Sequence, residues 1–595
     1  MSHTRPSYLG AEQTMIAAIH PLCGDPALWY LKIMALDERT RLLAQQSPTR
    51  SAPYPEWNGK AAEPEEAPSR FGLWQIGALF GIMLAYANTS LVWATHETVA
   101  SRFDTLRSSS WMMTSFTIGY CVTLPLYGRL SDNYGRLRPL IASYSIFSFG
   151  CTLCGVGQTY WQVVLGRIIT GCGASGIISL ASIVITDIAP PSDVAVLRSY
   201  VNVASSIGLA SGGPVGGLLV GTFGWRWSFL GQVPIVAICC LLTARGLQKY
   251  LPHVKEEEEE EEEEEYEEEE RDSINSEAAM KSPTMSFDYP GAIFLAIGMA
   301  SFLTVIDLQS QLSWGHPVII GTTSLCVLSV LAFFAFETWP GNRELLIPLR
   351  LLKTGVGAYC AGQFISQIAP YFSNTQGLSD AQAGGHIAPS SFGSALGNLF
   401  AGQMIKRFGS YKKLSLTALF LSIATSLLIL VQWSHPIGVL AGLAVFPFGF
   451  FGGIILSTQF IGLYNCASKP EMATAIGMYY MSQQIGIALG ISCTSSLLKR
   501  QFQATLEQRL VGIPHYMEII KKILTDSSVV AALPASVRLL VARCFMASFW
   551  VVPAFSIATQ VFAVLPMALA RERRAGDRGK SETEQVAVSG AGIDA

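Results

Sequence analysis

The chain has 595 residues, of which 50% are hydrophobic and 14% are charged, and its mean hydropathy is +0.37. Soluble globular proteins contain about 25% charged residues, so this composition excludes an ordinary soluble domain and indicates a membrane protein. The formal net charge of −3 excludes a strongly basic, nucleic-acid-binding chain.

Thirteen apolar stretches, each close to the ~20 residues that a helix needs to cross hydrocarbon, predict transmembrane helices. In chain order they are Leu73–Thr95, Trp111–Tyr127, Pro139–Gly157, Val163–Thr186, Tyr200–Gly221, Ser228–Leu247, Tyr289–Leu308, Val318–Phe336, His386–Ile405, Leu414–Gln432, Ile437–Leu463, Ala473–Leu498 and Phe545–Leu569. A further stretch, Gly355–Phe372, is short and is interrupted by polar residues and by Pro370. We interpret it as an atypically short ninth span from which residues are missing.

Basic residues near span ends indicate which side faces the cytoplasm. The loop 128–138 carries three arginines, and with fourteen spans the basic residues at 343–353, 406–413 and 571–580 fall on its side. With thirteen spans the carboxyl-terminal arginines would lie outside. The charge pattern therefore favours fourteen spans with both termini in the cytoplasm.

The spans divide the chain into six parts. They are a disordered cytoplasmic tail (1–70), a first six-helix bundle (71–247), an acidic cytoplasmic linker (248–288), two extra helices (289–336), a second six-helix bundle (337–569) with a non-cytoplasmic loop (499–543), and a cytoplasmic tail (570–595). The linker contains fourteen glutamates between positions 256 and 270, which repel one another and favour a solvated, disordered segment.

The most specific motif is GRLSDNYGRLRP, Gly128 to Pro139, between the second and third spans. Glycine permits close approach of helices and backbone, and an aspartate there is able to cap a helix start or pair with a nearby arginine. The pattern resembles the signature loop of the major facilitator superfamily. The resemblance implies a cytoplasmic gating loop formed by Gly128, Asp132, Gly135, Arg136 and Arg138.

A second segment, GQMIKRFGSYKK from Gly402 to Lys413, repeats the two glycines seven residues apart and the basic flank. Parallel repeats of this kind are typical of facilitator transporters, with the substrate cavity between two six-helix bundles. Eight spans separate the repeats, so two extra helices lie between the bundles. The predicted fold is an all-α polytopic membrane protein that resembles the fourteen-helix drug:proton antiporter branch of the superfamily.

Two helices carry further matches to that branch. Arg167 lies inside the fourth span, where a charge is expensive and is by default a functional candidate, although a purely structural partner is the alternative. It matches a family arginine that assists proton transfer. In the fifth span Gly208, Gly212, Gly213, Pro214, Gly216 and Gly217 resemble the antiporter motif that bends and packs that helix.

The first span departs from the family, because Asn88 stands where an aspartate is usual. An amide does not take up a proton reversibly, so coupling would need another acid, and the candidates are Glu97, Asp187 and Asp307. Glu97 adjoins His96, and a histidine beside a carboxylate is a candidate proton relay. Adjacent residues, however, point to different helix faces, and placement at the membrane edge is the alternative. Asp187 matches a family acid at a helix end, where packing or gating is its expected role.

Polar residues of four spans are candidates for the substrate cavity: Asn88, Thr95, Ser182, Gln459, Gln483 and Gln484. Gln483 and Gln484 lie in a stretch with Tyr479 and Tyr480, whose aromatic faces attract organic cations. Hydrogen bonding between helices is the alternative role for these amides.

Outside the spans, Glu38, Leu42 and Leu43 form an acidic dileucine pattern that resembles vacuolar or lysosomal sorting signals, though so short a match also arises by chance. The chain has no nucleotide-binding, zinc-binding or catalytic signature. We therefore expect no enzyme activity and no cofactor, with a proton gradient as the energy source and with protons, a small solute and the lipid bilayer as the partners of a monomer.

The resemblance extends over about 71–569 and is specific for the family and its branch. It is weaker for the substrate, and within the branch it points to fungal vacuolar basic amino acid transporters and their multidrug relatives. It implies a proton-coupled antiporter that carries basic amino acids into the vacuole. Drug or toxin efflux at the plasma membrane is the second hypothesis, and a non-transporting nutrient sensor is the third.

Overall fold

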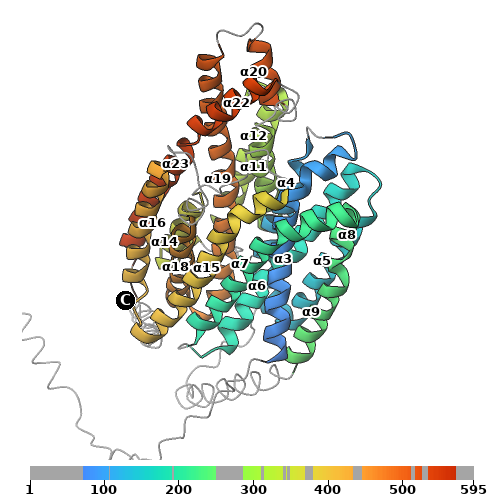
Figure 1. Ribbon diagram of the computed structural model, residues 1–595. Coiled ribbons are helices and arrows are strands. Elements are labelled where there is room, and N and C mark those ends of the chain that lie inside the picture. Colours follow the sequence, from blue (N-terminus) through green and yellow to red (C-terminus); the bar gives the residue numbers. More distant parts are fainter. Residues whose placement is uncertain are drawn as a thin grey trace, which may run out of the picture. The chain divides into compact units, whose positions relative to one another are not determined.

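The computed structural model describes residues 72–105, 108–190, 193–248, 286–287, 289–309, 314–338, 343–344, 349–368, 380–432, 445–510, 516–525, 534–570 and 572. These residues belong to one compact unit, Arg70–Ala595, and nearly all of them are helical (Figure 1). The sorting pattern at Glu38, Leu42 and Leu43 and the acidic run 256–270 lie outside the described residues. The predicted division into parts is not tested by the structure and stays a prediction.

The first half of the unit is built around one buried helix. Its helices are α3 (Leu73–Ser101), α4 (Trp111–Tyr134), α5 (Leu137–Val156), α6 (Tyr160–Ile188), α7 (Val194–Thr222), α8 (Trp225–Leu230) and α9 (Gln232–Leu247). Most of α6 is buried, because α3, α4 and α5 pack around it. Helix α3 also packs along α7 and α9.

The second half repeats this arrangement around α18. Its long helices are α14 (Gly355–Gln367), α15 (Asp380–Phe408), α16 (Lys412–Gln432), α18 (Val445–Cys466), α19 (Met472–Arg509), α22 (Ala535–Ser548) and α23 (Val551–Leu569). The short elements α13 (Leu349–Leu352) and η2 (Lys469–Glu471) precede α14 and α19. The halves meet along two pairs of helices, α7 with α15 and α4 with α19.

Two further helices lie between the halves in sequence, α11 (Tyr289–Leu308) and α12 (Pro317–Thr338). They pack on each other, and α11 also packs on both α4 and α19, so it covers the seam between the halves. Met299 and Leu303 of α11 are buried there beside Cys121 of α4. Just outside these helices, β1 (Ser286–Phe287) pairs in parallel with β2 (Arg343–Glu344).

Helix is present in every range predicted to span the membrane, but not every helix has the length and hydropathy of a span. Among the described residues ten helical segments are long and apolar enough to cross a bilayer. The four remaining predicted spans correspond to α4, α14, α15 and α19, which do not meet these criteria. Helix α14 has 13 residues, or roughly 20 Å, against about 30 Å of hydrocarbon. The short ninth helix is therefore observed, while the total of fourteen spans stays a prediction.

The end of the unit opposite the 128–138 loop carries helices that the sequence analysis assigned to a loop. Helix α19 continues to Arg509 instead of ending near Leu498, and α20 (Tyr516–Thr525) and α22 fold against it (Figure 1). A separate apolar cluster that includes Leu506, Ile520 and Val541 holds them together. We call this end the outer end, and the end with the 128–138 loop the inner end.

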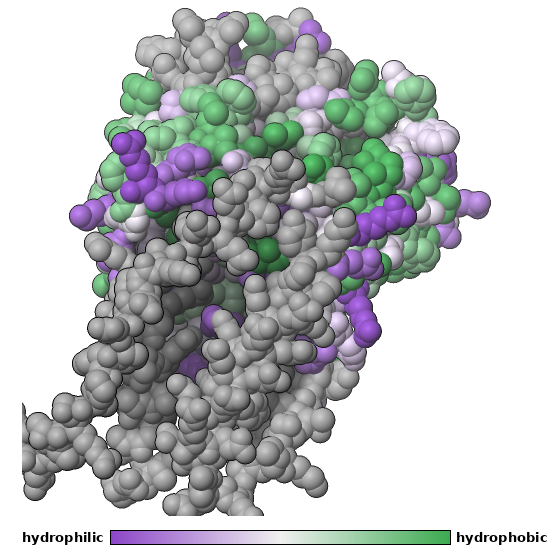
Figure 2. All heavy atoms as spheres, turned by 90° about the horizontal axis from the view of Figure 1, so that it is seen from below, coloured by the Kyte–Doolittle hydropathy of each residue, from purple (hydrophilic) through white to green (hydrophobic). Residues whose placement is uncertain are grey.

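Large hydrophobic side chains are exposed along the helices, as expected for a surface that contacts lipid. Only 17% of the apolar stretch of α12 is buried, and its Leu328 and Leu331 are 64% and 61% exposed. Figure 2 shows the molecule from below, where hydrophilic side chains form separate clusters with hydrophobic surface between them.

Candidate functional site: an inner-end closure and a buried arginine centre

The 128–138 segment forms a tight turn between α4 and α5 and carries an ion-pair cluster. Arg136 donates from Nε to Asp187 Oδ2 at 2.8 Å and from Nη1 to Asp132 Oδ1 at 2.5 Å. Burial opposes the charge of Arg136, but the carboxylates of Asp187 and Asp132 outweigh it and raise the pKa above its usual value. The predicted pairing of Asp132 with an arginine is confirmed. Capping by Asp132 is wrong, because it lies inside the last turn of α4.

The two glycines of this motif have different structural roles. Gly135 ends α4 with φ +75°, a backbone conformation that favours glycine. Gly128 lies across the seam from α19, where an added Cβ would be 3.2 Å from Ala473 O. The loop thus brings the first half against the start of a helix of the second half. Arg138 lies on the first turn of α5 and is exposed.

The repeated motif in the second half forms the corresponding contact with the first half. Gly402 lies against α7, where an added Cβ would be 3.0 Å from Ala195 O, and Gly409 has φ +66°. Lys406 stands at the position of Asp132 and donates to Asp193 Oδ1, just before α7, at 2.7 Å. The inner end is therefore closed by two related contacts, α4 on α19 and α15 on α7.

A second polar centre lies inside the first half, around Arg167. The guanidinium is 1% exposed, donates from Nη1 to Asn88 Oδ1 and from Nε to Met112 O at 3.2 Å, and lies 4.5 Å from the centroid of the Phe116 ring. Asn88 Nδ2 in turn donates to Gln232 Oε1 at 3.0 Å. No carboxylate of a described residue pairs with Arg167. The structure thus joins two predicted site residues, Asn88 and Arg167, and adds Gln232.

The glycines of α7 allow it to pack closely on α3. An added Cβ at Gly208, Gly212 or Gly216 would overlap Met83 O, Ala87 O or the Leu91 side chain. The predicted glycines Gly208, Gly212 and Gly216 therefore form this contact, whereas Gly217 is only half buried and Gly213 donates its amide N–H to Ser90 Oγ at 3.0 Å. Pro214 lies inside α7, as predicted.

The Ser182 hydroxyl lies 2.6 Å from that of Tyr480, but the other predicted residues do not converge on one place. Glu97 is exposed near the outer end of α3, and His96 Nδ1 lies 3.1 Å from Trp93 O, so these neighbours do not form a pair. Thr95 bonds to Leu91 O within its own helix. Gln483 and Gln484 are half buried on α19, and the Tyr479 hydroxyl donates to Leu456 O at 3.1 Å. Gln459 Nε2 donates to Ser366 Oγ at 3.1 Å.

A polar cluster between the halves was not predicted from the sequence. Asn202 Nδ2 of α7 donates to Asn398 Oδ1 of α15 and to Ser457 Oγ of α18, each at 3.1 Å. Arg198 was not predicted either, because the fifth span was expected to start at Tyr200, whereas α7 begins at Val194. The signal available was an arginine two residues before an apolar run.

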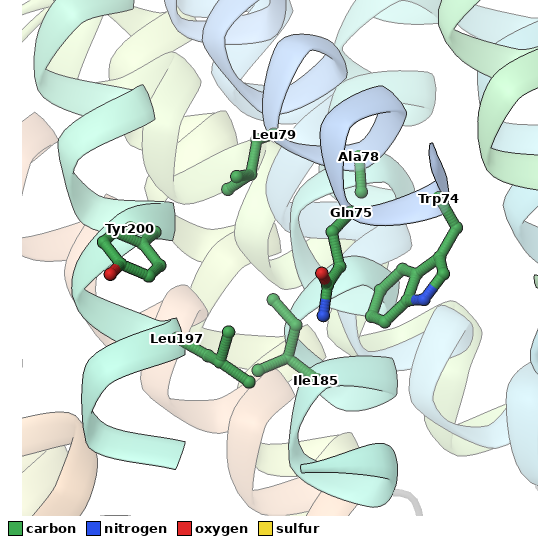
Figure 3. Close-up of a pocket in the computed structure, with 7 residues that line it drawn as sticks. All are labelled: Trp74, Gln75, Ala78, Leu79, Ile185, Leu197 and Tyr200. Atoms are coloured by element: carbon green, nitrogen blue, oxygen red, sulfur yellow. The ribbon is translucent and has the colours of Figure 1, made fainter. Parts of the chain in front are cut away.

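A pocket lies at the inner end of α3 and does not involve the residues above. It is lined by four residues of α3, one of α6 and two of α7 (Figure 3): Trp74, Gln75, Ala78, Leu79, Ile185, Leu197 and Tyr200. The lining is apolar apart from Gln75 and Tyr200. It offers no group that would bind a charged solute.

Comparison with known proteins assigns the family. Residues 78–491 match the model of the Major Facilitator Superfamily. The chain is 28% identical over 480 residues to a vacuolar membrane amino acid uptake transporter of Schizosaccharomyces pombe, with 77% of each chain covered. It is 25% identical to vacuolar basic amino acid transporter 2 of Saccharomyces cerevisiae (73% of this chain, 92% of the relative) and 25% identical to a multidrug resistance protein of S. pombe (79% and 86%).

Proposed function

Because the chain belongs to the Major Facilitator Superfamily and is an integral membrane transporter, not an enzyme, we propose that it moves amino acids into the vacuole in exchange for protons. The observation that carries the transport mechanism is the paired closure of the inner end, Gly128 on α19 and Gly402 on α7. Such contacts between two related halves allow one end to close while the other opens.

The substrate class rests on the relatives. Two relatives that align with most of this chain are named for amino acid transport at the vacuolar membrane, and one of them for basic amino acids. We propose lysine and arginine as the first substrates to test, and the vacuolar membrane as the location. The inner end would then face the cytoplasm, in accord with its arginines.

Proton coupling needs an acid that is able to release its proton, and position 88 does not supply one. Asp307, near the outer end of α11, is 7% exposed and accepts a hydrogen bond from Thr114 Oγ1 of α4 at 3.1 Å. We propose that it carries the proton, since α11 covers the seam along which the halves move. Asp307→Asn should then abolish uptake driven by a pH gradient while lysine counterflow, which needs no net proton movement, continues. Loss of both activities, with intact protein, would contradict this role.

The direct test of the function is uptake of labelled lysine and arginine into vacuolar vesicles from cells with and without this protein. We expect uptake that depends on the protein and collapses when an uncoupler removes the proton gradient. Uptake that persists without the gradient would contradict antiport with protons.

Drug efflux is the second candidate, and the similarity to the multidrug resistance protein of S. pombe favours it. Protein-dependent resistance to lipophilic drugs in whole cells, without amino acid uptake into vesicles, would support it. Binding of lysine to the purified protein without uptake would instead support the nutrient sensor.

A further inference from the structure

The second buried arginine, Arg198, lies on the second turn of α7 and is 2% exposed. A charge at such a position is costly and marks a functional candidate. Its neighbours Leu197 and Tyr200 line the pocket beside α3 (Figure 3), whereas Arg198 contacts the second half of the protein. It therefore lies between the two halves, near the inner end.

The surroundings of Arg198 leave most of its hydrogen-bonding capacity unused. A guanidinium has five N–H groups. Nη1 donates to Ser182 Oγ at 2.7 Å, and buried Nε has no partner. The guanidinium carbon lies 3.9 Å from the centroid of the Phe460 ring and 5.3 Å from that of Tyr480. Aromatic faces stabilise a cation but accept its N–H groups only weakly.

Arg198 differs from Arg136 and Arg167 in the partners of its guanidinium. Arg136 pairs with two carboxylates, whereas Arg167 donates to Asn88 and Met112 of its own half and has no buried nitrogen without a partner. Arg198 pairs with no carboxylate among the described residues, and both aromatic rings belong to helices of the opposite half, α18 and α19. Its aromatic contacts therefore depend on the inner end being closed, whereas its hydrogen bond to Ser182 lies within its own half.

Opening of the inner end would separate α7 from Phe460 and Tyr480. The guanidinium would then face the space between the halves with most of its N–H groups free. We propose that Arg198 binds the carboxylate of the transported solute in this inward-open state, through paired N–H···O hydrogen bonds. This inference rests on the proposed amino acid transport and names the part of the solute that is recognised.

The chemistry of the site favours a carboxylate over a phosphate. Arg167 and Arg198 are the only buried basic side chains among the described residues. They have no partner residue in common, so Arg198 acts as a single cation. A guanidinium matches one carboxylate in a bidentate arrangement. After the solute has left Arg198 and the inner end has closed, the rings of Phe460 and Tyr480 would again contact the guanidinium in place of the carboxylate.

The test compares matched ligands that differ only in the carboxylate. Binding of lysine and of cadaverine, which is lysine without its carboxylate, is measured on the purified full-length protein. We expect the native protein to bind lysine at least about tenfold more tightly than cadaverine, because hydrogen bonds between two charged groups are stronger than those between neutral groups. Arg198→Gln should lower lysine affinity to that of cadaverine without weakening cadaverine, and Arg198→Lys should be intermediate.

Arg226→Gln is the matched control, since Arg226 also lies over an aromatic ring, 4.8 Å from the centroid of Trp225, but near the outer end. It should keep the native preference for lysine. A preference that also survives in Arg198→Gln would overturn the inference and leave Arg198 as a structural contact. Melting temperatures of all variants identify any loss of binding that arises from unfolding.

A second ligand pair separates this inference from the proposed function. Fluorescein carries a carboxylate, and rhodamine 6G is an esterified cationic dye of related size. Suppose that lysine does not bind, that the native protein prefers fluorescein over rhodamine 6G, and that Arg198→Gln loses this preference. Amino acid transport is then wrong and the carboxylate site stands. If the native protein and Arg198→Gln both take up lysine and prefer it over cadaverine to the same extent, the proposed function stands and the carboxylate site is wrong. If neither pair shows a preference for the carboxylate, the site is wrong.

Discussion

Gly402 of α15 packs directly on Ser199 of α7, where an added Cβ would lie 2.9 Å from both the Cβ and the Oγ of Ser199. Gly128 has the corresponding position in the other motif, 3.2 Å from Ala473 O. Each half therefore contributes one glycine that allows a helix of the opposite half to approach. These are the contacts that must break when the inner end opens.

Gly402→Val should favour the inner-open state, because its side chain does not fit between α15 and α7. We expect faster alkylation of a cysteine placed at Ser182, which is 1% exposed in the closed state, in a background without other cysteines. Gly452→Ala, at a glycine with open space around its Cβ position, is the control and should leave the alkylation rate unchanged. An unchanged rate in Gly402→Val would mean that this contact does not hold the inner end closed.

The Lys406–Asp193 pair offers a test by charge exchange. Both side chains are partly exposed, 49% and 40%, so the pair contributes about 0.5–1 kcal/mol, which corresponds to roughly a two- to fivefold change in the closed population. Lys406→Asp and Asp193→Lys should each lower the initial uptake rate by at least this factor, since each adds a like-charge contact. The double variant should recover the rate. Failure to recover would show that the residues act separately.

Asn88→Asp would place a carboxylate against the Arg167 guanidinium. We expect uptake to be retained or raised, because the buried cation gains an opposite charge and the first helix gains an acid. Asn88→Leu, which leaves Arg167 Nη1 without its partner, should instead reduce the amount of folded protein. Vesicle uptake divided by the protein present in the membrane is the measurement. Abolished transport in Asn88→Asp would contradict this account of the first helix.

The contact between α3 and α7 should be sensitive to volume at Gly212. A valine there would overlap the backbone at Ala87 O, and overpacking of this kind typically costs about 1–3 kcal/mol or more. We expect Gly212→Val to lower the melting temperature or prevent accumulation of the protein. Gly221→Val on the same helix, with no atom within 4 Å of the Cβ position, should be tolerated. Equal melting temperatures would show that α3 moves aside without cost.

Local patterns predicted several parts of the site correctly. The repeat of two glycines seven residues apart led to the equivalence of the two motifs, and Gly135 and Gly409 do share a positive φ. The pairing of His96 with Glu97 did not form, because adjacent residues on a helix point in different directions. The fifth span was predicted to begin too late, because its apolar run starts after the helix does. The first turns of α7, which contain Arg198, were therefore not included in the prediction.

The sequence by itself determined the membrane class, the presence of a helix in each predicted span and the two motif turns, because these depend on runs of about 20 apolar residues and on local backbone conformation. Only the tertiary structure decided which polar groups meet. Arg167 and Asn88 are 79 positions apart, and Ser182 and Tyr480 are 298 positions apart. Such partners are set by how helices pack and rotate against one another, and a single sequence holds no pairwise signal for that packing.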